Sequence, residues 1–164
     1  MGGRFTASVE QLRPDPKYGD KVLSKFINCV MEDGKKSVAT RIIYDAMDII
    51  DEKLAKIEDP NKPADAIGCF HMAINNVKPY VEVRSKRIGG ANYQVPMQVN
   101  NKRQQSLAFR WIIAAVRSEK GRPFAHRLAD EIVAAAKGEG KAMQTRDQTH
   151  RMAEANKAFA HFAH

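Results

Sequence analysis

Apolar residues recur every three or four positions over six stretches of the chain, the spacing that gives a helix one apolar face. Aspartate, proline and glycine residues lie between these stretches, as they do where helices begin and end. The pattern predicts six helices that pack through their apolar faces. They cover about residues 21–31, 36–54, 60–78, 101–119, 123–137 and 141–155, and the third opens in the proline-containing turn 59–63.

Between the third and fourth predicted helices the apolar period changes from helical to two. Residues 80–86 and 93–99 alternate polar and apolar side chains, and Gly89 and Gly90 lie in the segment 87–92 that joins them. Alternation is typical of a strand, and a glycine pair favours a tight reversal. We therefore predict a mainly α fold, a six-helix bundle with one protruding two-stranded β-hairpin. A hairpin that buries little is marginally stable, so we expect it to be mobile in the free protein.

The remaining segments lie at the two ends of the chain. With 164 residues, 43% of them hydrophobic, the chain fits one domain spanning residues 1–164. Residues 1–19 are expected to form an irregular arm, because Pro14 and Pro16 oppose a helix. Residues 156–164 form a polar and aromatic tail without a clear period.

Positive charge is concentrated in the second half of the chain. Residues 1–80 hold 12 Lys+Arg against 12 Asp+Glu, whereas residues 81–164 hold 15 against 7, which accounts for the whole net charge of +8. The 36 residues from 83 to 118 contain seven basic side chains and no acidic one. Such a one-sided field attracts a polyanion, and release of counterions from phosphates drives the binding. The distribution indicates a nucleic acid partner.

Three arginines of the fourth predicted helix form a stripe. Arg103, Arg110 and Arg117 are spaced by seven, so they lie nearly opposite the apolar face of the helix. No carboxylate on this helix is placed to neutralise them, and the planar guanidinium group suits phosphate. We predict that this arginine stripe contacts nucleic acid and is not only a solvated helix face.

The hairpin is a second candidate interface. Arg84, Lys86 and Arg87 lie toward its tip, while Tyr80 and Tyr93 can stack on bases or pack at its foot. A basic ribbon can enter a groove or follow a nucleic acid backbone, although it can also serve as a dimerisation arm.

Lys35 and Lys36 lie near the start of the second predicted helix, where backbone N–H groups also favour phosphate. The segment 34–37 resembles the end of a nucleotide-binding loop, but Cys29 stands where that loop needs its first glycine. We therefore interpret the two lysines as an RNA contact and not as part of a nucleotide-hydrolysing site.

Other chemistry finds little support in the sequence. Cys29 and Cys69 lie in apolar helical patterns, so we expect buried reduced thiols and no disulfide. The five histidines show no metal-binding spacing, and no acid, base and nucleophile converge. We predict no enzyme, cofactor, metal site or small-molecule substrate. Without a signal peptide or a run of about 18 apolar residues, we expect a soluble, cytoplasmic protein with no membrane partner.

Several motifs resemble small-subunit ribosomal protein seven of the bacterial type. They occur in the order of that family over nearly the whole chain, and the hairpin and closing motifs are the most specific. The motifs are Pro14–Gly19, Asp33–Ser37, Arg87–Pro96, Arg110–Ile112 and His150–His161.

The resemblance implies a fold, a six-helix bundle with a protruding β-ribbon. It also implies a function, primary binding of small-subunit ribosomal RNA. Such a protein would organise the three-prime major domain, nucleate assembly of the subunit head, and neighbour small-subunit proteins nine and eleven. The ribbon tip would lie near the exit-site tRNA and the mRNA path; it comprises Arg87, Ile88, Gly89, Gly90, Ala91, Asn92 and Tyr93. The resemblance and the pattern of basic residues together predict the residues that bind RNA. They are Arg4, Lys17, Lys35, Lys36, Arg84, Lys86, Arg87, Lys102, Arg103, Arg110, Arg117, Arg146, His150, Arg151 and Lys157.

Two other classes of function stay open from the residues alone. A helical DNA-binding regulator could use the same basic ribbon and arginine stripe, and it would protect duplex DNA as well as RNA. An enzyme acting on RNA comes third, because the sequence shows no cluster of acid, base or metal-binding side chains.

Overall fold

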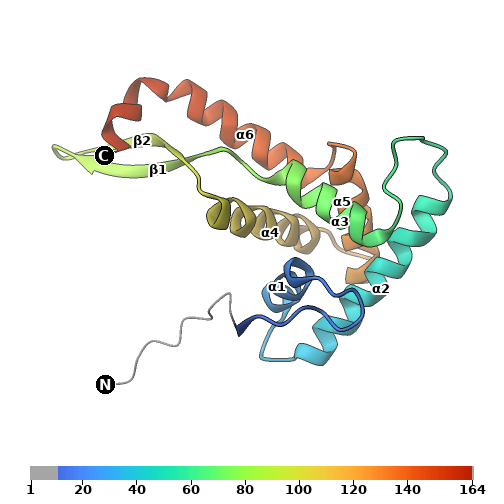
Figure 1. Cartoon of the computed structure of the whole chain (residues 1–164). Coiled ribbons are helices and arrows are strands. Elements are labelled where there is room, and N and C mark those ends of the chain that lie inside the picture. Colours follow the sequence, from blue (N-terminus) through green and yellow to red (C-terminus); the bar gives the residue numbers. More distant parts are fainter. Residues whose placement is uncertain (1–10, 164) are drawn as a thin grey trace, which may run out of the picture.

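The computed structural model describes residues 11–163. Its elements are α1 Lys21–Val30, α2 Lys36–Ala55, α3 Ala66–Val77, β1 Val81–Ile88, β2 Ala91–Gln98, α4 Asn101–Ser118, α5 Phe124–Ala136, α6 Lys141–Ala155 and the 3₁₀ helix η2 Lys157–Ala163. The predicted mainly α fold is confirmed, with one antiparallel hairpin between α3 and α4 (Figure 1).

The core is a cluster of buried apolar residues to which all six α-helices contribute. Phe26 of α1 contacts Phe70 of α3 and Phe109 of α4, with ring centroids 5.3 and 5.1 Å apart, and all three rings are buried. From α6 only Ala142 and Met143, in its first turn, join this cluster. The rest of α6 extends beside the hairpin, away from α1 and α2 (Figure 1).

α3 begins later than the sequence predicts. Its N-cap is Asp65, whose carboxylate accepts the N–H of Gly68 at 2.8 Å, and Asp51 of α2 accepts the N–H of Ala66 at 2.7 Å. Two carboxylates thus satisfy N–H groups that the first turn leaves without intrahelical partners. The prediction that the helix opens within the turn 59–63 is wrong, because these polar caps determine where it starts.

The hairpin turn is tighter than predicted. Ile88 pairs with Ala91, so the turn consists of Gly89 and Gly90 alone instead of the segment 87–92. Their φ angles are 58° and 86°. Positive φ at both turn positions matches the twist of the flanking strands and strongly favours glycine. Both strands therefore run farther toward the tip than the alternation of side chains indicated.

The C-terminal tail is ordered against the hairpin. The ring of Tyr93 lies 5.2 Å from the rings of both Phe159 and Phe162, and the Lys86 ammonium donates to the Phe162 carbonyl at 2.7 Å. Nearer the body, Val95 is fully buried. Among the strand residues only Glu82 and Val95 are buried, as expected of a hairpin that buries little, and its mobility in the free protein stays a prediction.

The two thiols lie in different environments. Cys69 of α3 is fully buried, and burial raises its pKa to about 11. Cys29 is exposed, so the prediction of a buried thiol is wrong there, because its position on α1 lies off the face that carries Phe26 and Val30 into the core. Both cysteines are free. Among residues 11–163, no helix is both long and apolar enough to cross a bilayer.

Candidate nucleic-acid interface

A buried carboxylate joins the hairpin to α4. Glu82 of β1 is 7% exposed and accepts hydrogen bonds from Arg84 at 2.7 Å and from Arg103 at 3.1 Å. Burial alone would raise the pKa of Glu82, but the hydrogen bonds and positive charges of Arg103 and Arg84 outweigh it and hold the pKa below its ordinary value. Arg103, a predicted RNA-binding residue of α4, therefore also holds the hairpin on the helical body, whereas Arg84 bonds to Glu82 within β1.

The arginine stripe of α4 is not a row of unneutralised charges. Arg103 pairs with Glu82, and Arg117 pairs with Glu32 at 2.8 Å. Arg110 is exposed and has no ion pair or hydrogen bond within the described part of the chain. No carboxylate of α4 neutralises the stripe, as the sequence indicates, but carboxylates of β1 and of the connection after α1 pair with two of its three arginines.

The connection between α1 and α2 presents the two predicted lysines differently. Lys36 donates a hydrogen bond to the side-chain oxygen of Asn28, which ties it back to α1. Lys35 is exposed and makes no such bond within residues 11–163. This connection therefore supplies one available cation and not a lysine pair.

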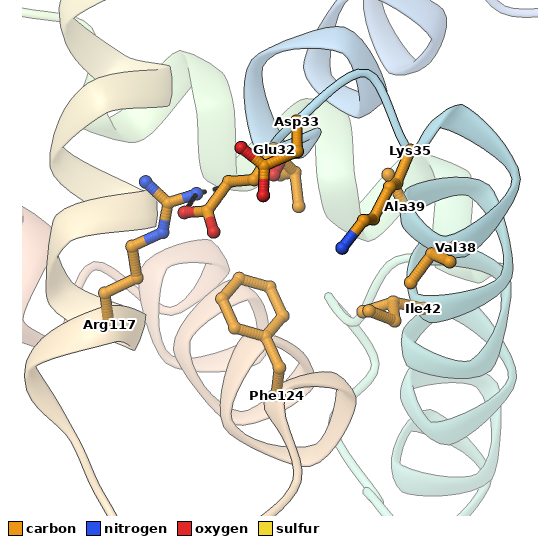
Figure 2. Close-up of a pocket in the computed structure, with 9 residues that line it drawn as sticks. Glu32, Asp33, Lys35, Val38, Ala39, Ile42, Arg117 and Phe124 are labelled. Carbon is orange, nitrogen blue, oxygen red and sulfur yellow. Dashed lines mark hydrogen bonds and ion pairs between the residues drawn. The ribbon is translucent and has the colours of Figure 1, made fainter.

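Lys35 borders an open hollow of about 400 Å³ between the connection, α2 and the start of α5 (Figure 2). Arg117 brings a second positive charge to its wall, while Glu32 and Asp33 bring two negative ones, and Phe124 adds an apolar surface. Because the charges balance, the hollow itself does not favour a phosphate group.

Lys17 is held against α2. Its ammonium lies 3.2 Å from Asp48 and above the rings of Tyr18 and Tyr44, at 5.3 and 5.0 Å from their centroids. The hydrogen bond to Asp48 raises the pKa of Lys17. Buried Asp15 accepts the backbone N–H of Lys17 at 3.1 Å and the Tyr44 hydroxyl at 2.7 Å. These contacts explain the local fold of the arm without any nucleic acid.

At the tip of the hairpin, Arg87 is exposed and has no partner in the described chain. Lys86 instead bonds to the tail. Tyr93 packs against both tail rings, whereas Tyr80, at the foot, is 68% exposed. Of the two predicted roles for these tyrosines, packing holds for both, Tyr93 on the tail rings and Tyr80 on the ring of His150, although most of Tyr80 stays exposed.

α6 carries two kinds of predicted contact residue. Arg146 donates to the Asn76 carbonyl at 2.6 Å and pairs with Asp147 at 2.7 Å, so it fastens α6 to the end of α3. Arg151 is exposed and unpaired among the described residues, and Lys157 forms an exposed pair with Glu154.

His150 links α6 to the hairpin. Its Nε2 accepts the backbone N–H of Tyr80 at 3.4 Å, and the two ring centroids are 4.0 Å apart. Burial and the positive charge of Arg146 lower the pKa of His150, against a smaller opposing effect of Asp147. The imidazole is therefore neutral at physiological pH and acts as an acceptor, not as a cation.

Comparison with known proteins identifies the family of the chain. The family model described as ribosomal protein S7p/S5e matches residues 3–157. The chain belongs to the ribosomal protein S7p/S5e family. Similar proteins named small ribosomal subunit protein uS7 include that of Rhodopirellula baltica, 58% identical over 161 residues, which cover 98% of this chain and 99% of the relative. That of Acidovorax sp. is 54% identical over 162 residues (99% of each), and that of Thermotoga neapolitana is 50% identical over 159 residues (97% of each).

Membership of the S7p/S5e family confirms the resemblance seen in the motifs. The family consists of ribosomal proteins and not of enzymes, as predicted. Within residues 11–163 no three side chains of His, Cys, Asp or Glu gather as metal ligands.

The S7p/S5e chain thus presents two classes of predicted cation. Those without a partner in the described residues are Lys35, Arg87, Lys102, Arg110 and Arg151. Those bonded to other groups are Lys17, Lys36, Arg84, Lys86, Arg103, Arg117, Arg146 and Lys157. Arg4 lies outside the described residues.

Sequence reasoning missed the acids that organise this surface. Glu82 lies just before the acid-free stretch, two residues from Arg84 on one strand, so both side chains leave the same face of the ribbon. That spacing could have indicated their pairing. No local pattern indicated the contact of Glu82 with Arg103, because it depends on how α4 packs beside the hairpin.

Proposed function

We propose that this chain is a structural constituent of the small ribosomal subunit and binds the RNA of that subunit directly. The observation that carries the proposal is a group of exposed cations with no partner in the described chain, on three elements that are fastened together. The cations are Arg87, Lys102, Arg110 and Arg151. The pair Glu82–Arg103 fastens the hairpin to α4, and Tyr80 with His150 fastens it to α6. Because these contacts join the three elements, less ordering is needed when their cations bind phosphates.

Within that role we assign the chain as a primary binder that organises the three-prime major domain of the RNA and nucleates assembly of the subunit head. The hairpin extends from the helices in Figure 1, a shape that suits a tip, residues 87–93, reaching the exit-site tRNA and the mRNA path. Neighbouring proteins nine and eleven are proposed partners, and the cytoplasmic ribosome is the proposed location. The name of the relatives, small ribosomal subunit protein uS7, supports the assignment to that subunit.

The test is binding to a transcript of the three-prime major domain, beside an unrelated folded RNA of equal length and a DNA duplex, over a salt series. We expect at least about a hundredfold preference for the ribosomal transcript. If six to ten phosphates are contacted, affinity should fall by ~10³–10⁵ between about 50 and 200 mM salt.

Equal binding to all three nucleic acids would overturn the proposal and reduce the basic surface to a general polyanion patch. A preference for the duplex, with the protein eluting as a dimer, would instead support the DNA-binding regulator.

A further inference from the structure

Tyr80 places an aromatic ring on the surface at the foot of the hairpin. At 68% exposed it is the most exposed large hydrophobic residue of the described chain. Its backbone is fixed on both sides, because its N–H donates to His150 at 3.4 Å and its carbonyl accepts the N–H of Val99 at 3.3 Å. One side of the ring lies on the His150 ring, at an interplanar angle of 37°. Tyr80 and His150 together form an aromatic surface, here called the aromatic platform.

The aromatic platform borders a hollow of about 480 Å³ formed by the foot of the hairpin, the start of α4 and the end of α6. Pro96 and Val99 give it an apolar wall. Gln98 and Gln104 also line it, and neither side-chain amide bonds to another group within residues 11–163. Each amide can both donate and accept. A stacking surface beside free amides is the combination by which proteins hold an unstacked base.

The charges around the hollow favour a base over a phosphate inside it. Glu154 and Lys157 line it as an ion pair of 2.7 Å, so their charges cancel. His150 is neutral, since burial and the charge of Arg146 lower its pKa. Unpartnered cations lie close by in sequence: Lys102 precedes Gln104 on α4, and Arg151 follows His150 on α6. Neither cation lines the hollow itself, so the hollow carries no net positive charge that would select a phosphate.

We propose that the aromatic platform binds one unpaired nucleobase of a single-stranded or looped RNA segment. The base stacks on the open side of the Tyr80 ring and presents its edge to Gln98 or Gln104. This inference rests on the proposed function, because RNA supplies the base. It adds a contact that is independent of charge to a surface that otherwise binds through phosphates.

The test compares Tyr80→Leu with the matched control Tyr80→Phe, which keeps the ring, in the full-length chain. Affinity is measured by fluorescence anisotropy for an unstructured single-stranded RNA of twelve nucleotides, over a salt series. Stacking tolerates any sequence, so such an RNA is a sufficient probe. We expect Tyr80→Leu to weaken binding by about 5- to 100-fold and Tyr80→Phe by less than about twofold. The salt slope should be unchanged, because no phosphate contact is lost.

A second arm uses the same oligonucleotide with abasic residues throughout, which keeps the phosphates and removes the bases. Wild type and Tyr80→Leu should bind this probe equally. Thermal unfolding of both variants establishes that each is folded.

The outcomes separate the two proposals. Equal affinity of wild type and Tyr80→Leu for the twelve-nucleotide RNA would overturn the base site. The base site would also be overturned if Tyr80→Leu bound the abasic probe more weakly than the wild type does, since the ring would then act through the phosphates. Failure of the wild type to prefer the ribosomal transcript would count against the proposed function, whatever the variants do.

Discussion

At the scale of single residues, three buried carboxylates determine how elements meet. Asp15 accepts from the arm and from Tyr44 of α2, and Glu82 accepts from the hairpin and from α4. Glu131 of α5 accepts the N–H of Ala142 at 2.8 Å, in the first turn of α6. A buried carboxylate is costly unless it is hydrogen-bonded, so each of these junctions is specified by the bonds that satisfy the acid.

Replacing Glu82 with glutamine is expected to lower the free energy of unfolding by about 1–2 kcal/mol at neutral pH, because two charge-assisted contacts become neutral. The folded-state pKa of Glu82 lies below the ordinary value of 4.5. The advantage of the wild type should therefore be complete above pH 4.5 and be lost as the pH falls through the folded-state pKa. Urea unfolding of both proteins across this pH range measures the difference in their free energies of unfolding. A difference that does not change with pH would contradict the prediction.

Gly140→Ala tests the junction at Glu131. Gly140 has a φ of 97°, and an added Cβ would lie 2.9 Å from Glu131 Oε1, the atom that caps α6. We expect the free energy of unfolding to fall by about 2–3 kcal/mol, because the added methyl group strains the backbone and displaces the carboxylate that caps α6. Gly121→Ala is the matched control, since Gly121 has a φ of 93° with nothing within 4 Å of the added atom.

The control Gly121→Ala should lower the free energy of unfolding only by the cost of backbone strain, about 1–2 kcal/mol. Thermal unfolding of the two variants gives the comparison. Equal losses would mean that the contact with Glu131 contributes nothing to stability.

At the scale of elements, the hairpin depends on its neighbours. A two-stranded ribbon alone is marginal in water. Here η2 covers Tyr93 with two phenylalanine rings, α4 holds Glu82 through Arg103, and α6 holds the backbone of Tyr80. The tail that follows α6 therefore returns to support an element that lies far earlier in the chain.

Removing both tail rings, Phe159→Ala with Phe162→Ala, is expected to speed amide exchange in the hairpin by about tenfold, because the aromatic contacts that hold it closed are lost. Hydrogen-exchange mass spectrometry of peptides covering Ala91–Gln98 is the measurement. Lys157→Ala is the control, since this ammonium pairs with exposed Glu154 and not with the hairpin. Unchanged exchange in the double variant would show that the tail does not support the ribbon.

At the scale of the whole molecule, the net charge of +8 comes from residues 81–164, where many cations already have partners. Exposed ion pairs contribute little to stability. An arginine in such a pair must break its bond to the carboxylate before it can bind a phosphate, and the carboxylate then loses its partner. The cations without partners are therefore expected to dominate the dependence of RNA binding on salt.

Arg110→Gln should reduce the slope of log affinity against log salt by about 1 and leave the fold intact. Arg122→Gln removes the same charge from an arginine that pairs with Asp130 at 2.6 Å, and its slope should equal that of the wild type. Titration of the ribosomal transcript over a salt series measures both. An Arg110→Gln slope equal to that of the wild type would place Arg110 outside the interface.

The sequence by itself determined the elements and the family. Helical spacing predicted α4, α5 and α6 to within a residue or two, and the glycine pair Gly89-Gly90 located the reversal of the hairpin. These features are encoded locally, in side-chain period and backbone preference. The hairpin and closing motifs identified the family because they are long and specific.

Only the tertiary structure decided which cations are available. Lys17 meets Asp48 across 31 residues and Arg103 meets Glu82 across 21, so no local pattern contained these pairs. The same holds for the tail rings on Tyr93. A sequence period tells which face of an element is buried, but the partner that a charged side chain meets depends on how that element packs against the others.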